Sequence, residues 1–209
     1  MTNIICFGDS NTYGIAPDGT RYQANQRWPS LLLTLLNQKA GNELFSVIED
    51  GQPNRTLVHN PPFSGEKTGL RYFKDSLAQS QPDLALLMLG TNDLKRKYNL
   101  SAPEIAAGLK TLIEQSLLWQ PALNIMAICP PPILEVAHYA DIYQGGAVKS
   151  MALEGEYQAI ARELNCAFFA AGSVVKSSDV DGIHWSSHAH HHLANALSTD
   201  ILSRVHATP

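Results

Sequence analysis

A serine, an acid and a histidine in this chain have the residue types and the spacing of a nucleophilic triad. Ser10 stands in the motif Gly8-Asp9-Ser10-Asn11, and Asp181 precedes His184 by three residues near the far end of the chain. A serine hydroxyl needs a histidine to take its proton, and the histidine needs a carboxylate that fixes its tautomer. We therefore expect Ser10 to be a nucleophile, His184 its base and Asp181 the acid, with one loop supplying the last two.

A third polar motif, Gly90-Thr91-Asn92-Asp93, follows an apolar run in the middle of the chain. When a nucleophile attacks an acyl carbonyl, the carbonyl oxygen gains negative charge, and N–H groups aimed at that oxygen stabilise it. The side-chain amide of Asn92 is one candidate donor, and the backbone N–H of Ser10 is another. The three motifs together predict acyl chemistry at a serine.

The elements that must position these residues alternate along the chain. Short apolar runs followed by longer amphipathic ones are typical of βαβ units, which build a parallel sheet with helices on both faces. Five strands favour the flavodoxin-like order 2-1-3-4-5 in a three-layer α/β/α fold. The expected strands are 3–7, 44–49, 84–89, 123–129 and 166–170, and the expected helices are 27–38, 66–79, 101–119, 147–164 and 187–205.

This fold predicts where the motifs meet. Ligands of open α/β sheets bind outside the carboxyl ends of the strands. Ser10, the segment 51–56, Asn92 and the loop 181–184 each follow one of the expected strands. We therefore expect all four to converge on one rim of the sheet.

The composition is that of one compact domain, and we expect residues 1–209 to form it. The chain has 209 residues, of which 44% are hydrophobic, enough for a substantial core. Its net charge of −4 gives no support to nucleic acid or to an anionic membrane surface as a partner. No apolar run approaches the roughly 18 residues of a membrane span.

The cysteines indicate a reducing compartment. Cys6, Cys129 and Cys166 each lie in an apolar run that reads as a strand, so we expect buried free thiols. The first expected strand begins so close to Met1 that no signal peptide fits before it. We expect a cytoplasmic protein, with an export signal removed from the chain as the open alternative.

The three motifs resemble those of the SGNH, or GDSL-type, hydrolases over essentially the whole chain. Phe7-Gly8-Asp9-Ser10 is similar to the block that holds the family's nucleophile. The motif at 90–93 is similar to the block whose asparagine donates to the oxyanion, and the one at 181–184 to the block of acid and base. Three further segments resemble the bacterial arylesterase/acyltransferase branch: Cys129-Pro130-Pro131-Pro132, Gly145-Gly146 and Ala171-Gly172-Ser173-Val174.

One segment departs from the family pattern. The family's second block resembles Asn-x-Gly-x-Ser-Gly-x-Thr, in which the later glycine donates its N–H to the oxyanion. Residues 49–56 read Glu-Asp-Gly-Gln-Pro-Asn-Arg-Thr, so Gly51 keeps the register and Asn54 falls at that glycine. A backbone N–H survives this change, and asparagine tolerates positive φ better than most residues. The resemblance implies Asn54 as a third donor, with Gly51 as the alternative if the register is different.

Other residues have simpler explanations. His188 and His192 would share one face of a helix and could bind a metal ion. No cysteine or carboxylate nearby completes such a site, so a solvent-exposed helix face is the simpler explanation. Trp185 follows His184, so it could line an acyl pocket or pack in the core. The segment Gly65-Glu66-Lys67-Thr68 only approaches a phosphate-binding Walker loop.

The residues and the resemblance together predict a serine esterase that hydrolyses small carboxylic esters, with short acyl or aryl groups, through an acyl-enzyme. Acyl transfer to alcohols could accompany hydrolysis, and no metal or organic cofactor is expected. The segment 130–146 has few charges and should lie at the rim, where the resemblance implies a homo-oligomer with a narrow access path. The alternatives are a carbohydrate O-acetylesterase, a lysophospholipase or thioesterase, and a catalytically silent binding domain of the same fold.

Overall fold

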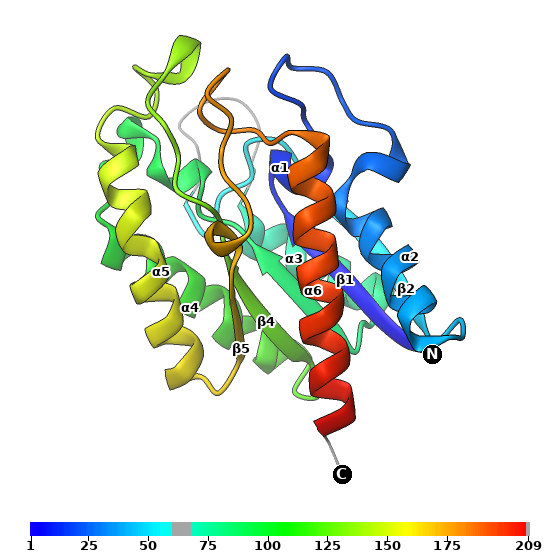
Figure 1. Cartoon of the computed structure of the whole chain (residues 1–209). Helices are drawn as coiled ribbons and strands as arrows, with labels where there is room; N and C mark the ends of the chain where they lie inside the picture. Colours follow the sequence, from blue (N-terminus) through cyan, green and yellow to red (C-terminus); the bar gives the residue numbers. More distant parts are fainter. Residues whose placement is uncertain (60–67, 208–209) are drawn as a thin grey trace.

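A parallel sheet of five strands runs through the centre of the molecule in the order β2-β1-β3-β4-β5 (Figure 1). The computed structural model describes residues 1–59 and 68–207, with side chains at the C-terminal end described up to residue 204. The order confirms the predicted topology. The strands are β1 (Thr2–Gly8), β2 (Phe45–Gly51), β3 (Leu84–Met88), β4 (Asn124–Cys129) and β5 (Ala167–Ala170).

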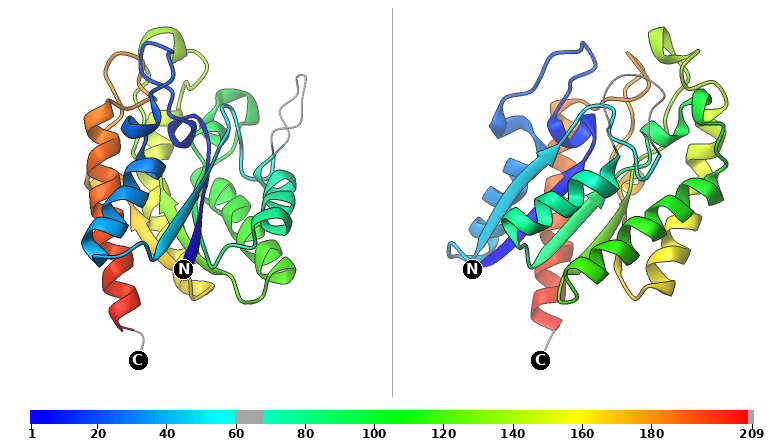
Figure 2. Two further views of the ribbon diagram at one scale, coloured as in Figure 1. Left: turned by 90° about the vertical axis from the view of Figure 1, so that its right-hand side faces the viewer. Right: turned by 180° about the vertical axis from the view of Figure 1, so that it is seen from behind.

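Helices cover both faces of the sheet, which confirms the predicted α/β/α layers (Figures 1 and 2). One face carries α2 (Trp28–Ala40) and α6 (Ser187–Ala207), which pack against each other. The other face carries α3 (Gly69–Ser80), α4 (Ala102–Trp119) and α5 (Gly146–Glu163).

Strand β1 shows why the sheet is buried on both sides. Successive side chains of a strand point to opposite faces. Accordingly, Ile5 and Phe7 join the core under α3, α4 and α5, whereas Ile4 and Cys6 join the core under α2 and α6. All four are apolar because neither face of the strand meets water, as expected for a parallel sheet.

The observed ends of the helices and strands agree with the predicted ends to within a few residues. Ser101 and Glu104 form the predicted capping box at the start of α4. The helix expected over 66–79 begins at Gly69, and its first two expected residues lie outside the described part of the chain. Strand β5 begins one residue late, so Cys166 lies just before it and is only half-buried, unlike the buried Cys6 and Cys129.

Short helices follow the strands and were not predicted. A four-residue helix, α1 (Ser10–Tyr13), begins directly after β1. Such an element is too short to show a helical period in the sequence. The 3-10 helices are η1 (Ala24–Gln26), η2 (Asn92–Leu94), η3 (Arg96–Tyr98), η4 (Ala137–Tyr139) and η5 (Ala171–Ser173).

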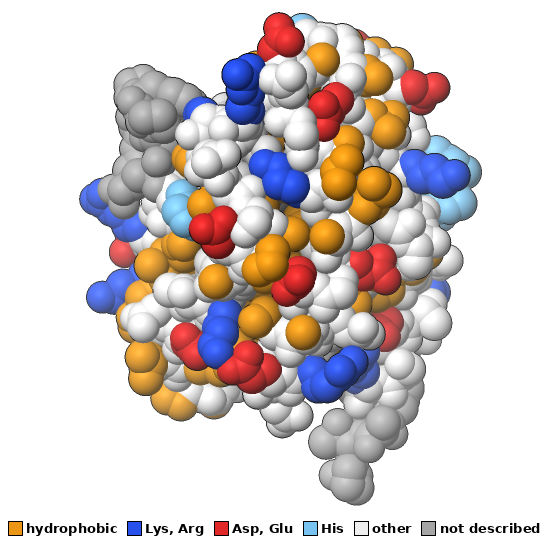
Figure 3. All heavy atoms as spheres, turned by 90° about the vertical axis from the view of Figure 1, so that its left-hand side faces the viewer, with side chains coloured by type: hydrophobic (Ala, Val, Ile, Leu, Met, Phe, Trp, Pro, Cys, Tyr) orange, Lys and Arg blue, Asp and Glu red, His pale blue; other side chains and the backbone are white. Residues whose placement is uncertain are grey.

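The two edges of the sheet are occupied differently. Loops that follow the strands lie together at the carboxyl edge, at the top of Figure 1, whereas the N-terminus and the end of α6 lie at the opposite edge. Figure 3 shows the face formed by α4 and α5, where hydrophobic side chains are exposed among charged ones. Val148 and Met151 of α5 are both exposed.

None of the described helices is both long enough and apolar enough to cross a lipid bilayer.

Candidate active site

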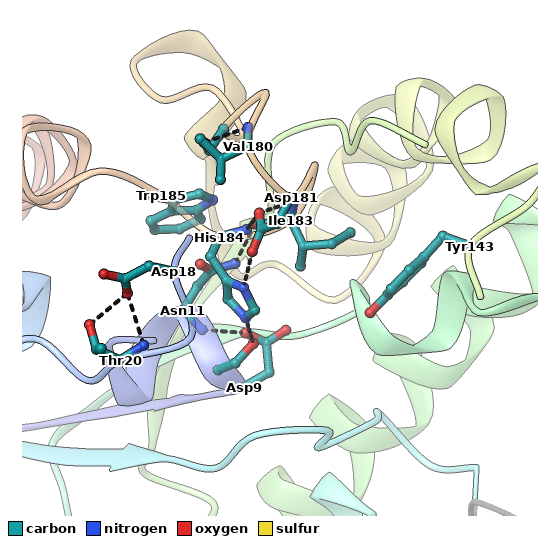
Figure 4. Close-up of polar contacts among 12 residues, drawn as sticks. Asp9, Asn11, Asp18, Thr20, Tyr143, Val180, Asp181, Ile183, His184 and Trp185 are labelled. Atoms are coloured by element: carbon teal, nitrogen blue, oxygen red, sulfur yellow. Dashed lines mark hydrogen bonds and ion pairs between the residues drawn. The ribbon is translucent and has the colours of Figure 1, made fainter. Parts of the chain in front are cut away.

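The structure brings Ser10, His184 and Asp181 into one hydrogen-bonded chain at the carboxyl edge of the sheet. The Nε2 atom of His184 lies 3.0 Å from Oγ of Ser10, and its Nδ1 atom lies 2.6 Å from Oδ2 of Asp181. All three residues are buried. Figure 4 shows the imidazole between the carboxylate of Asp181 and the turn that follows β1. The geometry matches a nucleophile, a base and an acid that orients the base.

Ser10 is held by a tight turn between β1 and α1. The side chain of Asp9 caps α1 by accepting from the backbone N–H of Asn11 at 3.0 Å. A Cβ atom on Gly8 would lie 2.0 Å from Oγ1 of Thr12, so only glycine lets α1 approach the strand this closely. The nucleophile candidate therefore sits on a closely packed turn.

The loop 181–184 is shaped by its own carboxylate. Oδ1 of Asp181 accepts from the backbone N–H groups of Ile183 and His184, both at 2.9 Å. This leaves Oδ2 for the imidazole. Gly182 has a φ of 81°, and a Cβ there would lie 2.1 Å from the carbonyl oxygen of Leu134. The short spacing seen in the sequence thus lets one acid fix both its loop and the histidine.

Burial sets the charge of the histidine. It lowers the pKa of His184 below its ordinary value of 6.5, while the nearby carboxylate of Asp181 works in the opposite direction. A lowered pKa keeps the imidazole neutral at neutral pH, and a neutral imidazole can accept a proton from Ser10.

The amide of Asn92 has a defined orientation. A backbone carbonyl can only accept, so Nδ2 of Asn92 must be the atom that faces the carbonyl oxygen of Arg55, at 3.1 Å. Oδ1 then faces the hydroxyl of Tyr143, which donates to it at 3.2 Å. Within the described part of the chain the second N–H of this amide has no acceptor, so it can donate to a ligand oxygen. Sequence reasoning identified Asn92 but not Tyr143.

Asn54, rather than Gly51, lines the same cavity as Ser10 and Asn92. Asn54 has a φ of 66°, the left-handed conformation that glycine adopts most readily. Within the described part of the chain, its backbone N–H meets no hydrogen-bond acceptor. Gly51 ends β2 and packs so closely against Tyr13 that a Cβ would lie 2.1 Å from the backbone nitrogen of that residue.

Arg55 fixes the loop that carries Asn54. Its guanidinium is buried and donates to the carbonyl of Gly8 at 3.0 Å and to Oδ1 of Asp50 at 2.8 Å. It also lies 4.0 Å from the ring centroid of Phe7. These contacts join the ends of β1 and β2, so the loop after β2 is held against the turn of Ser10.

A cavity of about 240 Å³ opens beside these residues. Its walls combine the predicted site residues with side chains that no sequence motif indicated, including a lysine and two tyrosines. The lining residues are Ser10, Ile15, Gly19, Pro53, Asn54, Asn92, Lys95, Tyr139, Tyr143, Ile183 and His184. A larger cavity of about 340 Å³ lies at the amino ends of the strands, beside Leu84 and Leu123, and contains none of the predicted site residues.

The other candidates from the sequence lie elsewhere. Trp185 is fully buried in the core on the side of α2 and α6. The rings of His188 and His192 are 4.2 Å apart, but no three side chains among the described residues are grouped to hold a metal ion. Residues 65–67 of the Walker-like segment lie outside the described part of the chain.

Comparisons with known proteins show the family and the fold. Residues 4–197 match the model of the GDSL-like lipase/acylhydrolase family. The structure is similar to that of Est24, a carbohydrate acetylesterase from Sinorhizobium meliloti, with a TM-score of 0.90 and 30% identity over 98% of this chain and 100% of that one. It is also similar to the aryl esterase of M. smegmatis, with a TM-score of 0.90 and 32% identity over 97% and 99% of the two chains. No curated protein matches the sequence.

Proposed function

This chain belongs to the GDSL-like lipase/acylhydrolase family, and on that premise we propose that it hydrolyses small carboxylic esters through an acyl-enzyme on Ser10. It is an ester-hydrolysing serine hydrolase of the SGNH type, as its family and its esterase neighbours show. The observation that supports the role of Ser10 is the chain of contacts from its Oγ through His184 to Asp181.

In the proposed first step, Oγ of Ser10 attacks the ester carbonyl while Nε2 of His184 takes the hydroxyl proton. The carbon–oxygen bond to the alcohol then breaks, and His184 gives the proton to the departing alcohol. In the second step, water attacks the acyl carbon while His184 takes a proton of that water. His184 then returns the proton to Oγ of Ser10 as the bond between Oγ and the acyl carbon breaks, and the carboxylic acid is released. Asp181 keeps the imidazole in the tautomer that can accept at Nε2.

The oxyanion of each tetrahedral intermediate needs donors. We propose the backbone N–H of Ser10, the backbone N–H of Asn54 and the free N–H of the Asn92 amide. The orientation of the Asn92 amide supports its role, because its oxygen already accepts from Tyr143 and its nitrogen is the atom that can donate. These groups supply the nucleophile, the base and the charge stabilisation, so the proposed chemistry requires no metal or cofactor.

The cavity supports a small substrate. At about 240 Å³ it lies below the usual volume of a drug-sized ligand site, roughly 300–1,000 Å³. Short acyl groups such as acetyl fit this size better than the long chain of a lysophospholipid. A carbohydrate O-acetylesterase is the second candidate, because a carbohydrate acetylesterase is among the similar structures. An aryl esterase of equal TM-score keeps small aryl esters as the first candidate.

A homo-oligomer forms part of the proposal. Leu134 and Ile142 are exposed on the segment that follows β4, and Val148 and Met151 are exposed on the adjacent helix α5. Exposed apolar side chains beside a site are typical of an interface. A subunit there would narrow access to the site, lower water activity near the acyl-enzyme and favour acyl transfer to alcohols.

A cytoplasmic location is also part of the proposal. Cys6, Cys129 and Cys166 are free thiols, which supports a reducing compartment.

The test of the proposed function is turnover of p-nitrophenyl acetate with Ser10→Ala as the comparison. The wild-type protein should hydrolyse this ester and should be labelled by a serine-directed phosphonate at Ser10 alone. Ser10→Ala should lose nearly all activity and keep its circular dichroism spectrum. Wild-type turnover by Ser10→Ala would remove Ser10 from the mechanism. Release of acetate from acetylated sugars, compared with aryl acetates at equal concentration, separates the two candidate substrates.

A further inference from the structure

Lys95 bonds to both loops that carry the asparagines of the proposed oxyanion hole. Its backbone N–H donates to the carbonyl of Asn92 at 3.4 Å, within the turn that follows β3. Its ammonium donates to Oδ1 of Asn54 at 2.6 Å, in the loop that follows β2. One residue therefore connects two loops that are far apart in the sequence.

The ammonium of Lys95 is held in an enclosed place. The residue is 7% exposed and lines the cavity together with Ser10 and His184. Its Nζ atom lies 5.7 Å from the ring centroid of Tyr143, the residue that orients the Asn92 amide. A lysine is seldom buried unless it is paired, and a hydrogen bond from a charged donor is stronger than a neutral one. The contact with Asn54 is therefore a firm constraint on that side chain.

The backbone of Asn54 explains why such a constraint matters. Asn54 has a φ of 66°, a conformation that residues with a Cβ adopt less readily than glycine. A glycine in the same place would have no side chain to anchor and would need none. With asparagine, the hydrogen bond from Lys95 to the side chain can hold the residue in the left-handed conformation. The direction of the Asn54 N–H depends on that conformation.

We propose that Lys95 is a positioning residue of the oxyanion hole, which holds the Asn54 side chain and thereby the backbone N–H that Asn54 presents to the substrate. The proposal rests on the proposed esterase function. Because the N–H acts on charge that develops in the transition state, loss of the lysine contact should lower kcat and leave KM nearly unchanged.

A cycle of variants tests whether Lys95 acts through Asn54. Steady-state hydrolysis of p-nitrophenyl acetate is measured for wild type, Lys95→Met, Asn54→Gly and the double variant. Lys95→Met should lower kcat by about 10–100-fold, less than the full loss of a donor. Asn54→Gly should stay within about threefold of wild type, since glycine adopts the conformation unaided. In that background Lys95→Met should cost at most about threefold, because the side chain through which it acts is gone.

Three further variants exclude a general structural effect. Lys95→Gln keeps an N–H donor and should recover most of the lost kcat. Asn54→Ala has no side-chain oxygen to accept from Lys95, and its Cβ still disfavours the left-handed conformation. It should therefore lose as much kcat as Lys95→Met. Lys97→Met removes an exposed charge from the same segment, outside the cavity lining, and should leave kcat unchanged. Thermal melting of each variant reports whether it folds.

The backbone amide resonance of Asn54 gives a readout that does not depend on turnover. In the wild-type protein this ¹⁵N amide should be ordered on the nanosecond timescale, and in Lys95→Met its order parameter should fall. An unchanged order parameter, or an equal kcat loss from Lys95→Met with and without the Asn54 side chain, would overturn the proposal. Absence of ester hydrolysis by wild type would refute the proposed function instead, and the resonance would still decide the role of Lys95.

Discussion

The side-chain amide of Asn11 donates to the carbonyl oxygen of Ile183 at 3.2 Å, across 172 positions of the sequence. Asn11 follows Ser10, and Ile183 precedes His184. This single bond therefore ties the turn of the nucleophile candidate to the loop of its base, and it does so beside the 3.0 Å contact between Ser10 and His184.

The first prediction concerns this bond. Asn11→Ala should destabilise the protein by about 1–3 kcal/mol, because the buried carbonyl of Ile183 loses its donor. It should also lower kcat, since the distance between Ser10 and His184 is no longer held from both sides. Denaturant unfolding and ester turnover measure the two effects. Full wild-type kcat in a destabilised Asn11→Ala protein would show that the bond serves stability alone.

A second prediction concerns pH. Because burial lowers the pKa of His184 below 6.5, more than half of its imidazole should be neutral at pH 6.5 and above. The value of kcat/KM should therefore fall with a midpoint below pH 6.5, as the imidazole becomes protonated. A profile that falls with a midpoint above 6.5 would contradict the assignment of His184 as the base.

Asp181→Asn extends this test. The carboxylate of Asp181 raises the pKa of His184 against the effect of burial, so its removal should move the acidic fall of the profile to still lower pH. The value of kcat/KM at high pH, where the imidazole is neutral, should also be lower than in wild type. The loss should be smaller than in His184→Ala, because the base remains while its orientation is lost. A shift of the profile to higher pH would mean that another acid controls the histidine.

A further prediction compares Asn92 with the residue that orients it. Asn92→Ala should lower kcat by about 10²–10³-fold, the usual cost of one oxyanion donor. Tyr143→Phe keeps the ring but removes the hydroxyl that donates to Oδ1 of Asn92, so kcat should fall by a smaller factor. The double variant Asn92→Ala with Tyr143→Phe should be no worse than Asn92→Ala alone. Additive losses would place Tyr143 in a role independent of Asn92.

The acyl-size prediction follows from the cavity. A volume of about 240 Å³ should favour acetyl over butyryl and both over dodecanoyl esters of the same phenol. Ser10→Ala is the control for uncatalysed hydrolysis in each assay. Light scattering at the assay concentration reports the number of subunits. A monomer that prefers dodecanoyl esters would favour the lysophospholipase alternative.

The sheet could be predicted because its determinants are local. In β1, residues that point to opposite faces are all apolar, and this pattern is visible in a single sequence. The strand order 2-1-3-4-5 then brings Ser10, Asn92 and the loop 181–184 to one edge. Their mutual contacts follow from topology, although no spacing between the motifs requires them.

The walls of the cavity could not be predicted in the same way. Lys95 and Tyr143 come from irregular segments, whose packing no periodic pattern encodes. A buried lysine reads as a surface residue in the sequence, since lysine is seldom buried. For Trp185 the sequence allowed two positions, the wall of an acyl pocket or the core, because the residue follows His184. The structure places it in the core.

The positions of the two chain ends have a practical consequence. The N-terminus and the end of α6 lie at the edge of the sheet opposite the loops that follow the strands (Figure 1), and residues of those loops line the cavity. Immobilisation on a solid support through either end would therefore leave the mouth of the cavity facing the surrounding liquid. A fusion partner attached at either end would likewise sit behind the sheet, so a tagged protein can serve directly for substrate screening.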